Sequence, residues 1–220
     1  MIYLEEKFNI LPASPATLDV FIELALNKLV PICEDLGARL VAAWYSDSEW
    51  FSQATHIMEF DDLDALKRFR INTSQNSTWG EYLGQLEDIA PERKSRLLEP
   101  LGPVPPEKLH KAIKRSQKTK GIGGPIGVYS IATLEVAPDK MPEFLELIKL
   151  AAAGFPIIAS WRPIGGSPNE VIDLWGMALR QEIYAPADKN LDENFFIPLR
   201  KLAPKERLIN IYTLPYSPLK

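Results

Sequence analysis

The residue best suited to chemistry in this sequence is His56, one of two histidines in the 220-residue chain. It lies in the run Thr55-His56-Ile57-Met58, where polar and apolar side chains mix as they do in a buried β-strand. An imidazole exchanges protons close to neutral pH, because its unperturbed pKa is about 6.5, and it can serve as a general base. The competing interpretation is a core histidine that a single hydrogen bond satisfies.

An acid stands at the matching place in the second half of the chain. His56 follows Trp44 by twelve positions, and Asp173 follows Trp161 by the same interval. Burying a carboxylate is costly unless it is paired, so Asp173 needs a partner or a wet cavity. A pairing of His56 with Asp173 is one hypothesis. The shared spacing establishes equivalent positions and does not establish contact.

Polar side chains also alternate along the first segment of the chain. Tyr3, Glu5 and Lys7 share one face of a predicted strand, and apolar residues occupy the other face. Such polar residues either line a wet interior or point to solvent. If they line a site, Tyr3 would orient a substrate together with Asp173, while Glu5 and Lys7 would contact it. The matching strand of the second half is more apolar, which favours the first half as the polar wall.

Large apolar side chains supply the remaining candidates for a binding site. Trp44, Met58, Trp161 and Trp175 all fall on predicted strands, either close to His56 or in the matching region of the second half. They predict an aromatic wall for an apolar or ring-containing ligand, or else ordinary packing of the core.

Composition excludes several kinds of site. A single cysteine, Cys33, and two histidines leave too few ligands for a cysteine-cluster zinc site, an iron–sulfur centre or an all-histidine metal site. The glycines at 121–124 precede Pro125 instead of opening a helix, so they do not form a dinucleotide fingerprint. Neither histidine stands in a context typical of a haem ligand. We therefore expect no metal and no cofactor.

The elements that position these residues occur twice along the chain. Ile2-Tyr3 recurs as Val128-Tyr129, and a proline follows each tyrosine by nine positions. A helical stretch, an apolar run ending in tryptophan and a late Ala-Pro pair then follow in the same order in both halves. The repeat predicts two units, at 1–103 and 126–220, joined by a basic linker at 104–125.

Each unit is predicted to run strand, helix, strand, strand, helix, strand. The best-defined elements are strands at 2–10, 39–45 and 53–60 with a helix at 15–35, and strands at 157–162 and 170–178 with a helix at 139–153. This order is that of the ferredoxin-like βαββαβ unit, an α+β fold. Two such units can close one barrel with helices outside, so we expect a tandem pseudo-dimer of the dimeric-α/β-barrel type within one chain.

The residues that carry the repeat resemble those of a known family. The start at Ile2-Tyr3, the run at 37–41, Trp44 and above all the strand at 55–60, which reads THIMEF, are similar to the NIPSNAP domain. The second unit keeps Trp175 and departs from the pattern at Asp173 and Gly176. Because the resemblance covers most of both units, it implies two tandem copies. It also implies the dimeric α/β-barrel superfamily, which includes cofactor-independent monooxygenases, lactone isomerases and haem enzymes. A fold of this kind does not by itself fix a function.

The distribution of charge along the chain indicates which kinds of partner the protein could bind. Residues 107–120 carry a net charge of +5, which leaves −9 for the rest of a chain whose net charge is −4. The segment predicts a solvated helix or a contact with an anionic membrane surface. It has no aromatic residue and the chain is acidic overall, so we expect no nucleic-acid partner. The tip at Trp50-Phe51 predicts a lid or a contact in a homo-oligomer.

No apolar run is long enough to span a membrane, and the first residues lack the pattern of a signal peptide, so we expect a cytoplasmic protein. The candidate residues together predict a barrel that binds a small, partly apolar organic molecule. Its chemistry would be cofactor-independent proton transfer of the isomerase, lyase or monooxygenase type. His56 would be the base, and the tryptophans would wall the pocket. The alternative is a non-enzymatic binding or scaffold protein acting through its surface and basic linker.

Overall fold

The chain forms strands and helices in the predicted order, with additions. The structure, a computed structural model, describes residues 1–13, 17–120, 127–176 and 192–220. The first half comprises β1 (Ile2–Asn9), α1 (Thr17–Leu24), a π-helical segment η1 (Ala25–Leu29), α2 (Val30–Leu36), β2 (Arg39–Ser46), β3 (Gln53–Phe60), α3 (Leu63–Ser74), α4 (Ser77–Ile89) and β4 (Glu92–Pro100). The second half comprises α5 (Pro106–Lys120), β5 (Val128–Glu135), α6 (Met141–Gly154), β6 (Ile157–Pro163), β7 (Glu170–Gly176), η3 (Asp192–Phe196), α8 (Ile197–Leu202) and β8 (Lys205–Thr213).

The described strands form one closed barrel, in the order β1-β3-β2-β8-β5-β7-β6-β4. Around this barrel the strands of the first half stand in the order β4-β1-β3-β2, and those of the second half in the equivalent order β8-β5-β7-β6. Strand β1 pairs antiparallel with β3 and β4, and β5 pairs antiparallel with β7. This is the strand order of the ferredoxin-like unit. The predicted α+β class and barrel-forming pseudo-dimer are therefore confirmed.

The compact units of the structure are not continuous halves of the sequence. Unit 1 contains Met1–Leu98, Ile113–Gly127 and Ile211–Lys220, whereas unit 2 contains Glu99–Ala112 and Val128–Asn210. Each unit thus includes a segment that follows the last strand of the other half. The predicted end of the first unit, at 103, lies in the segment Glu99–Ala112 that belongs to unit 2.

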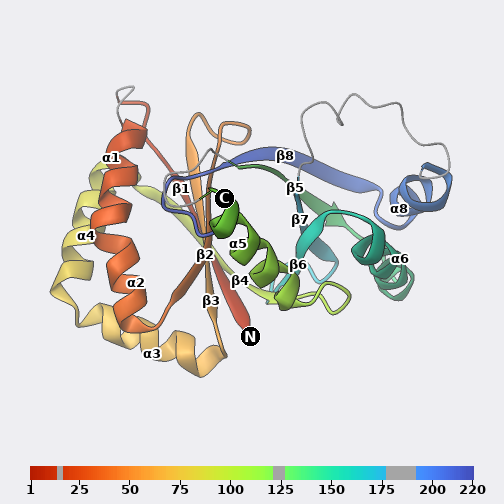
Figure 1. The fold of residues 1–220 in the computed structure, drawn as a ribbon, viewed down its shortest axis with the longest axis horizontal. Helices are drawn as coiled ribbons and strands as arrows, with labels where there is room; N and C mark the ends of the chain where they lie inside the picture. Colours follow the sequence, from red (N-terminus) through yellow and green to blue (C-terminus); the bar gives the residue numbers. More distant parts are fainter. Residues whose placement is uncertain (14–16, 121–126, 177–191) are drawn as a thin grey trace. The chain divides into compact units, whose positions relative to one another are not determined.

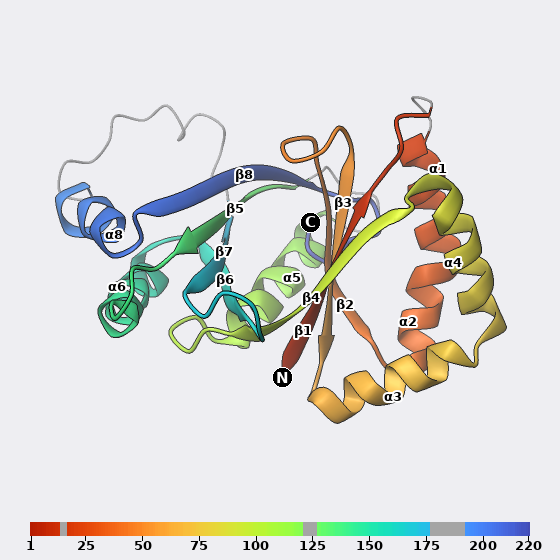
Figure 2. The same ribbon diagram turned by 180° about the vertical axis from the view of Figure 1, so that it is seen from behind.

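Unit 1 buries one face of its sheet against helices. Along β1, Ile2, Leu4 and Phe8 face the helical layer, and β3 presents Met58 and Phe60 to the same layer. Helical residues buried there include Phe21, Leu24, Leu29, Leu66, Phe69, Tyr82 and Leu86. Figures 1 and 2 show α1, α2, α3 and α4 along one side of these strands. Burial of this apolar surface, at about 25 cal/mol per Å², is the main term that stabilises the unit.

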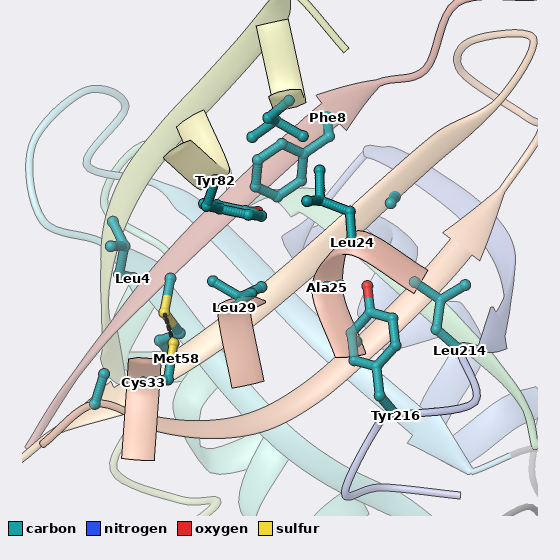
Figure 3. Close-up of a cluster of buried hydrophobic side chains, with 14 of the residues drawn as sticks. Leu4, Phe8, Leu24, Ala25, Leu29, Cys33, Met58, Tyr82, Leu214 and Tyr216 are labelled. Carbon is teal, nitrogen blue, oxygen red and sulfur yellow. Dashed lines mark hydrogen bonds between the residues drawn. The ribbon is translucent and has the colours of Figure 1, made fainter. Parts of the chain in front are cut away.

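The last residues of the chain complete the core of unit 1. Leu214 and Tyr216 belong to its buried cluster, and Figure 3 shows both side chains there. The amide of Leu214 donates to the carbonyl of Ala43 at 2.9 Å. The hydroxyl of Ser217 accepts a 2.9 Å hydrogen bond from the amide of Ala43. The segment at 214–217 is thus fixed to β2 through backbone as well as apolar contacts.

The segment after β4 completes unit 2 in an equivalent way. Leu101 and Val104 join a core that also buries Phe144, Ile148 and Leu199 of helices α6 and α8. The amide of Leu101 donates to the carbonyl of Ser160 at 2.8 Å. Ala43 and Ser160 each directly precede the tryptophan of their strand, so the two hydrogen bonds occupy matching positions. The exchange of segments therefore follows the repeat.

The helices depart from the prediction at two points. The helix predicted at 15–35 is divided, since η1 separates α1 from α2 and Pro31 stands at the start of α2. Proline lacks an amide hydrogen and crowds the preceding turn, which accounts for the irregular hydrogen bonding. Gly37 ends α2 with a φ of 81°, a left-handed conformation that glycine adopts freely. Two helices, α3 and α4, replace the single helix predicted between β3 and β4. The predicted end of the strand at 170–178 lies outside the described residues.

Truncation of Leu214 tests the contribution of the last residues. Its side chain is 3% exposed, and a core Leu→Ala substitution costs about 2–5 kcal/mol because burial is lost and a cavity remains. We expect Leu214→Ala to lower the urea midpoint followed by circular dichroism. The control Leu208→Ala, whose side chain is 60% exposed, should change stability by less than about 0.5 kcal/mol. Equal midpoints for the two variants would contradict a structural role for this segment.

Candidate functional site

One face of the sheet in unit 1 carries polar side chains. Tyr3, Glu5 and Lys7 alternate along β1 with the apolar residues that pack on the helices, so they lie on the opposite, helix-free face. We call this the inner face, because in a closed barrel with helices outside it is the concave side. Tyr3 is 1% exposed and Glu5 is 4% exposed. The polar residues of β1 are therefore buried, not solvated.

Each charge on the inner face has a partner of opposite sign. Arg96 of β4 donates to both carboxylate oxygens of Glu5, through Nε to Oε2 and through Nη2 to Oε1. The ammonium of Lys7 lies 3.3 Å from Glu49, and both side chains are about four-fifths buried. Arginine suits the first pair, because its planar guanidinium matches a carboxylate in two hydrogen bonds. Pairing of this kind offsets part of the cost of removing charges from water.

Further polar contacts extend this wall across neighbouring strands. The side-chain amide of Gln53 donates to Asn9 at 2.7 Å. The carboxylate of Glu59, which stands next to Tyr3 in the register of β1 and β3, forms an ion pair with Arg39. We call the set formed by Tyr3, Glu5, Lys7, Arg96 and Glu49, with Trp44 beside it on β2, the polar wall. It offers a hydroxyl, an ammonium and carboxylates in fixed positions, which suits orientation of a polar group on a bound molecule.

His56 lies on the other side of the same sheet. It pairs in register with Glu6 of β1, which faces the helices, and its ring centroid lies 4.9 Å from that of Phe8 and 5.8 Å from that of Phe21. Nε2 lies 2.6 Å from the hydroxyl of Tyr216. Nδ1 is buried and has no hydrogen-bond partner among the residues that the structure describes. His56 is therefore part of the helix-facing core.

The surroundings of His56 hold it neutral. Complete burial lowers the pKa of its imidazole from 6.5 to about 3, because the charged form loses its hydration. Burial also raises the pKa of the Tyr216 phenol well above its usual value. The phenol therefore keeps its proton, and one hydrogen bond joins its hydroxyl to Nε2 of the neutral ring. A base with so low a pKa accepts a proton poorly near neutral pH.

Asp173 occupies the equivalent, helix-facing side of the sheet in unit 2. It is 1% exposed, and one oxygen, Oδ1, accepts a 2.5 Å hydrogen bond from the Ser160 hydroxyl. The other oxygen has no hydrogen-bond partner within the described ranges. Burial raises the pKa of this carboxyl from 3.8 to about 7, and the neighbouring Glu206 adds to the rise, against the lowering effect of Ser160. Asp173 thus titrates close to neutral pH.

Within each unit, the predicted site residues lie on two different faces of the sheet. Within unit 1, Tyr3, Glu5, Lys7 and Trp44 share the inner face. His56 and Met58 lie on the helix-facing side, where Met58 contacts the Cys33 sulfur at 3.7 Å. Cys33 is buried, and its pKa is raised to about 12, as expected for an inert thiol. The predicted joint action of His56 and Tyr3 therefore lacks a shared face.

The predicted residues of unit 2 divide in the same way. Trp161 is 2% exposed and lies on the face of its sheet opposite Asp173. Trp175 packs in the helix-facing core, with its ring centroid 6.2 Å from that of Phe155 and 6.4 Å from that of Phe195. Trp175 thus lies among packing residues of the core, and its role in ligand binding stays a prediction.

Two contacts of the candidate residues, those made by Arg96 and Tyr216, could not be predicted from a sequence pattern. Arg96 stands among other charged residues, Glu92 to Arg96, and only the register of β4 against β1 shows which of them faces Glu5. Tyr216 lies 160 positions from His56, so no local spacing connects them. Glu49 does carry a signal, because it lies in a surface turn together with two aromatic residues, Trp50 and Phe51.

Metal and membrane sites can be assessed for the described part of the chain. Among those residues, no group of three or more histidine, cysteine, aspartate or glutamate side chains is placed to hold a metal ion. Likewise, none of the described helices has the length and apolar composition needed to cross a bilayer.

Comparison with known proteins identifies a family domain in the first half. The NIPSNAP family model matches residues 8–103. These residues therefore form a NIPSNAP domain, and the model matches no second copy in this chain. A search of curated protein sequences finds no significant match to the chain.

Solved structures support the fold over nearly the whole chain. A candidate monooxygenase from Lactobacillus acidophilus NCFM matches with a TM-score of 0.61 and 15% identity, over 96% of this chain and 93% of that one. A candidate monooxygenase from Fusobacterium nucleatum subsp. nucleatum ATCC 25586 matches with a TM-score of 0.60 and 11% identity, over 97% and 92%. An anthrone oxidase-like protein matches with a TM-score of 0.50 and 14% identity, over 96% and 90%. At these identities the likeness establishes the fold alone.

The protonation of His56 can be measured directly. We expect the ring signals of His56 in nuclear magnetic resonance spectra to stay constant between about pH 8 and pH 5, where an ordinary histidine titrates. His110→Gln removes the second histidine and assigns the signals. The unfolded chain takes up this proton near pH 6.5, and the folded chain takes it up only near pH 3. The free energy of unfolding therefore keeps its full value above pH 6.5 and decreases as the pH falls toward 3. A midpoint between pH 6 and 7 would contradict a neutral, desolvated ring.

Asp173 should have the opposite effect on stability. The folded carboxyl stays protonated up to about pH 7, whereas the unfolded one ionises near 3.8, so stability falls as the pH rises between these values. Asp173→Asn keeps an acceptor for Ser160 and removes the ionisation. We expect it to stabilise the protein by about 2–4 kcal/mol above pH 7 and to have little effect below pH 4, as measured by urea unfolding at each pH. A gain that is independent of pH would exclude ionisation as the cause.

Proposed function

We propose that the protein binds a small, partly apolar organic molecule against the polar wall on the inner face of unit 1. On this proposal it carries out cofactor-independent acid/base chemistry on that molecule. One observation carries the proposal: charged and hydroxyl side chains, all paired and largely buried, occupy a barrel face where apolar packing would be more stable. Buried charge pairs contribute little to stability compared with apolar side chains of similar size, so their presence favours a role in binding.

The composition of the wall indicates how a ligand would be held. Trp44 lies on the same inner face, where its indole is the apolar component of the wall. Lys7 supplies a positive charge that stabilises an enolate or phenolate oxygen, and its partner Glu49 lies within reach of the same ammonium. The Tyr3 hydroxyl orients a polar group of the ligand. We assign no proton transfer to His56, because its ring lies on the other face and is held neutral.

The substrate class follows from the chemistry of the wall and from the similar structures. Proteins described as candidate monooxygenases and as anthrone oxidase-like share this fold, and they suggest ring compounds with an acidic C–H next to a carbonyl. On this proposal the Glu49 carboxylate accepts that proton, and the resulting electron-rich enolate, held by Lys7, reacts with dioxygen without a cofactor. For anthrone the balanced outcome is anthraquinone and water, with dioxygen as the oxidant. Isomerase or lyase chemistry would begin with the same proton loss.

We further propose that the second half is a diverged copy of the NIPSNAP domain. The repeated strand order and the matching hydrogen bonds of Leu101 and Leu214 support a common origin. His56 and Asp173 occupy equivalent positions, which shows how far the copies have diverged in the chemistry of their cores. On this view unit 1 keeps the polar wall and unit 2 supplies a more apolar one, with Trp161 on its inner face.

A specific observation supports the alternative, non-enzymatic function. Phe51 is 72% exposed and Trp50 is 41% exposed at the turn between β2 and β3. Adjacent exposed aromatic residues are typical of contact surfaces. A scaffold or a homo-oligomer would use this turn, or the basic face of α5, and would leave the polar wall unused. Loss of self-association in a Trp50→Ser/Phe51→Ser variant that still bound small molecules would separate the two functions.

Substitution of Lys7 tests the polar wall. Ligands are screened by thermal shift over a set of phenols, anthrones and quinones, and dioxygen uptake is measured for every compound that binds. We expect Lys7→Met to weaken binding or slow uptake by at least about tenfold, because the ammonium is removed while the volume is kept. Glu5→Gln serves as a second variant, since it keeps the shape of the Arg96 contact. Lys111→Met, on the exposed face of α5, is the matched control and should behave as the unaltered protein.

The outcomes separate the two functions. Binding lost in Lys7→Met but kept in Lys111→Met, with similar unfolding midpoints, supports the polar wall. Binding that is equal in both variants would place the ligand elsewhere, and the absence of any bound ring compound would favour the scaffold function. Binding without dioxygen uptake would limit the proposal to a binding protein or to isomerase or lyase chemistry.

A further inference from the structure

The helix α5 carries a positively charged face that takes no part in the polar wall. Lys111, Lys114, Arg115 and Lys118 are all exposed. Because an α-helix turns by about 100° per residue, these four side chains fall within an arc of roughly 100° around the helix axis. We call this set the basic face. The one acidic residue of the helix, Glu107, lies in its first turn, so the cations follow one another along the rest of the helix.

The opposite side of α5 holds the helix against the protein. Leu109 is 1% exposed, and the hydroxyl of Ser116 accepts a 3.1 Å hydrogen bond from the amide of Lys220. The ammonium of Lys108 donates to the carbonyl of Ala152 at 2.5 Å, so this lysine is engaged within the protein and does not belong to the basic face. A face on a helix that is already packed pays little ordering entropy on binding.

The lysines of the basic face differ from other surface lysines of the chain. Lys149 and Lys205, for example, each form an ion pair with a glutamate. Within the described ranges, by contrast, no carboxylate forms an ion pair with Lys111, Lys114 or Lys118. Their charges are therefore available to an anion outside the chain.

The side chains of α5 indicate what kind of partner fits the basic face. Protein interfaces depend on an apolar centre with aromatic anchors, and the described residues of α5 present no exposed large apolar side chain. Three of the four cations are lysines, which are hydrated point charges and lack the planar, bidentate geometry by which arginine recognises particular groups. An anionic lipid surface suits such a face, because it presents many single negative charges in one plane.

The charge of the remaining chain sets the orientation of this contact. Residues 107–120 carry +5, and the rest of the chain carries −9. At physiological salt, charges farther from a surface than about 8 Å are largely screened. An anionic surface therefore attracts the protein when α5 faces it and repels the acidic surfaces.

From these observations we propose that the basic face of α5 docks the protein on an anionic lipid surface. The attraction is electrostatic and reversible, because no exposed apolar side chain accompanies the cations into the lipid. The basic face lies on a helix and not on the sheet that carries the polar wall, so this proposal does not depend on the function proposed for that wall.

Sedimentation of the full chain with lipid vesicles measures the contact. The vesicles are made of phosphatidylcholine, with about a third of the lipid replaced by phosphatidylserine. We expect the protein to bind these vesicles at least about tenfold more tightly than vesicles of phosphatidylcholine alone. An increase from about 0.05 M to about 0.3 M salt should release the protein, because screening shortens the range of the attraction.

A pair of charge-matched variants locates the contact on the chain. Lys114→Gln/Lys118→Gln removes two cations of the basic face and should weaken binding at least about tenfold, because each cation near an anionic surface contributes about fivefold. The control Lys149→Gln/Lys205→Gln has the same net charge, and its two substituted side chains are 70% and 74% exposed in the unaltered protein. We expect the control to bind as the unaltered protein.

The results distinguish a lipid surface from other anionic partners. Equal affinity of the two double variants for the anionic vesicles would overturn the site. No binding to these vesicles, equal binding to both kinds of vesicle, or displacement by soluble phosphoserine at constant ionic strength would overturn the lipid surface as the partner. Tighter binding to a DNA duplex than to the vesicles would overturn it as well.

Discussion

Strand alternation in β1 and β3 separates two sets of buried side chains by the thickness of a single sheet. Residues of even number along β1 pack against helices, and those of odd number carry the hydroxyl and charges of the inner face. A register shift of one residue would send the Glu5 and Lys7 charges into the helical layer and Phe8 out of it. The apolar layer therefore fixes where every polar group of the wall can stand.

The same alternation explains what the sequence could and could not predict. The period-two pattern of residues 2–10 predicted the strand and the shared face of Tyr3, Glu5 and Lys7, and the repeat predicted the βαββαβ order of the barrel. The motif around His56 marked the domain family correctly, but its position relative to Tyr3 depends on the pairing of β1 with β3, which no local pattern contains. Arg96 and Tyr216 could not be found for a related reason, since strand register and tertiary packing bring them to their partners.

The exchange of chain segments shows why the two halves depend on each other. Each core is closed by residues that follow the last strand of the other half, Leu101 in unit 2 and Leu214 in unit 1. A half of the chain taken alone would expose the apolar core surface that these residues cover. Exposure of apolar surface to water costs about 25 cal/mol for each Å². Both segments lie on the same chain as the cores that they close, so completion of each core needs no second molecule.

Strand β2 connects the inner face with the helix side of unit 1. Arg39 begins β2 and pairs with Glu59, which stands beside Tyr3 in the register of the sheet. Farther along the same strand, Trp44 lies on the inner face, while Ala43 holds the segment at 214–217. Strand β2 therefore holds the ion pair of Glu59, the inner-face tryptophan and the segment that closes the core of unit 1 in one continuous element.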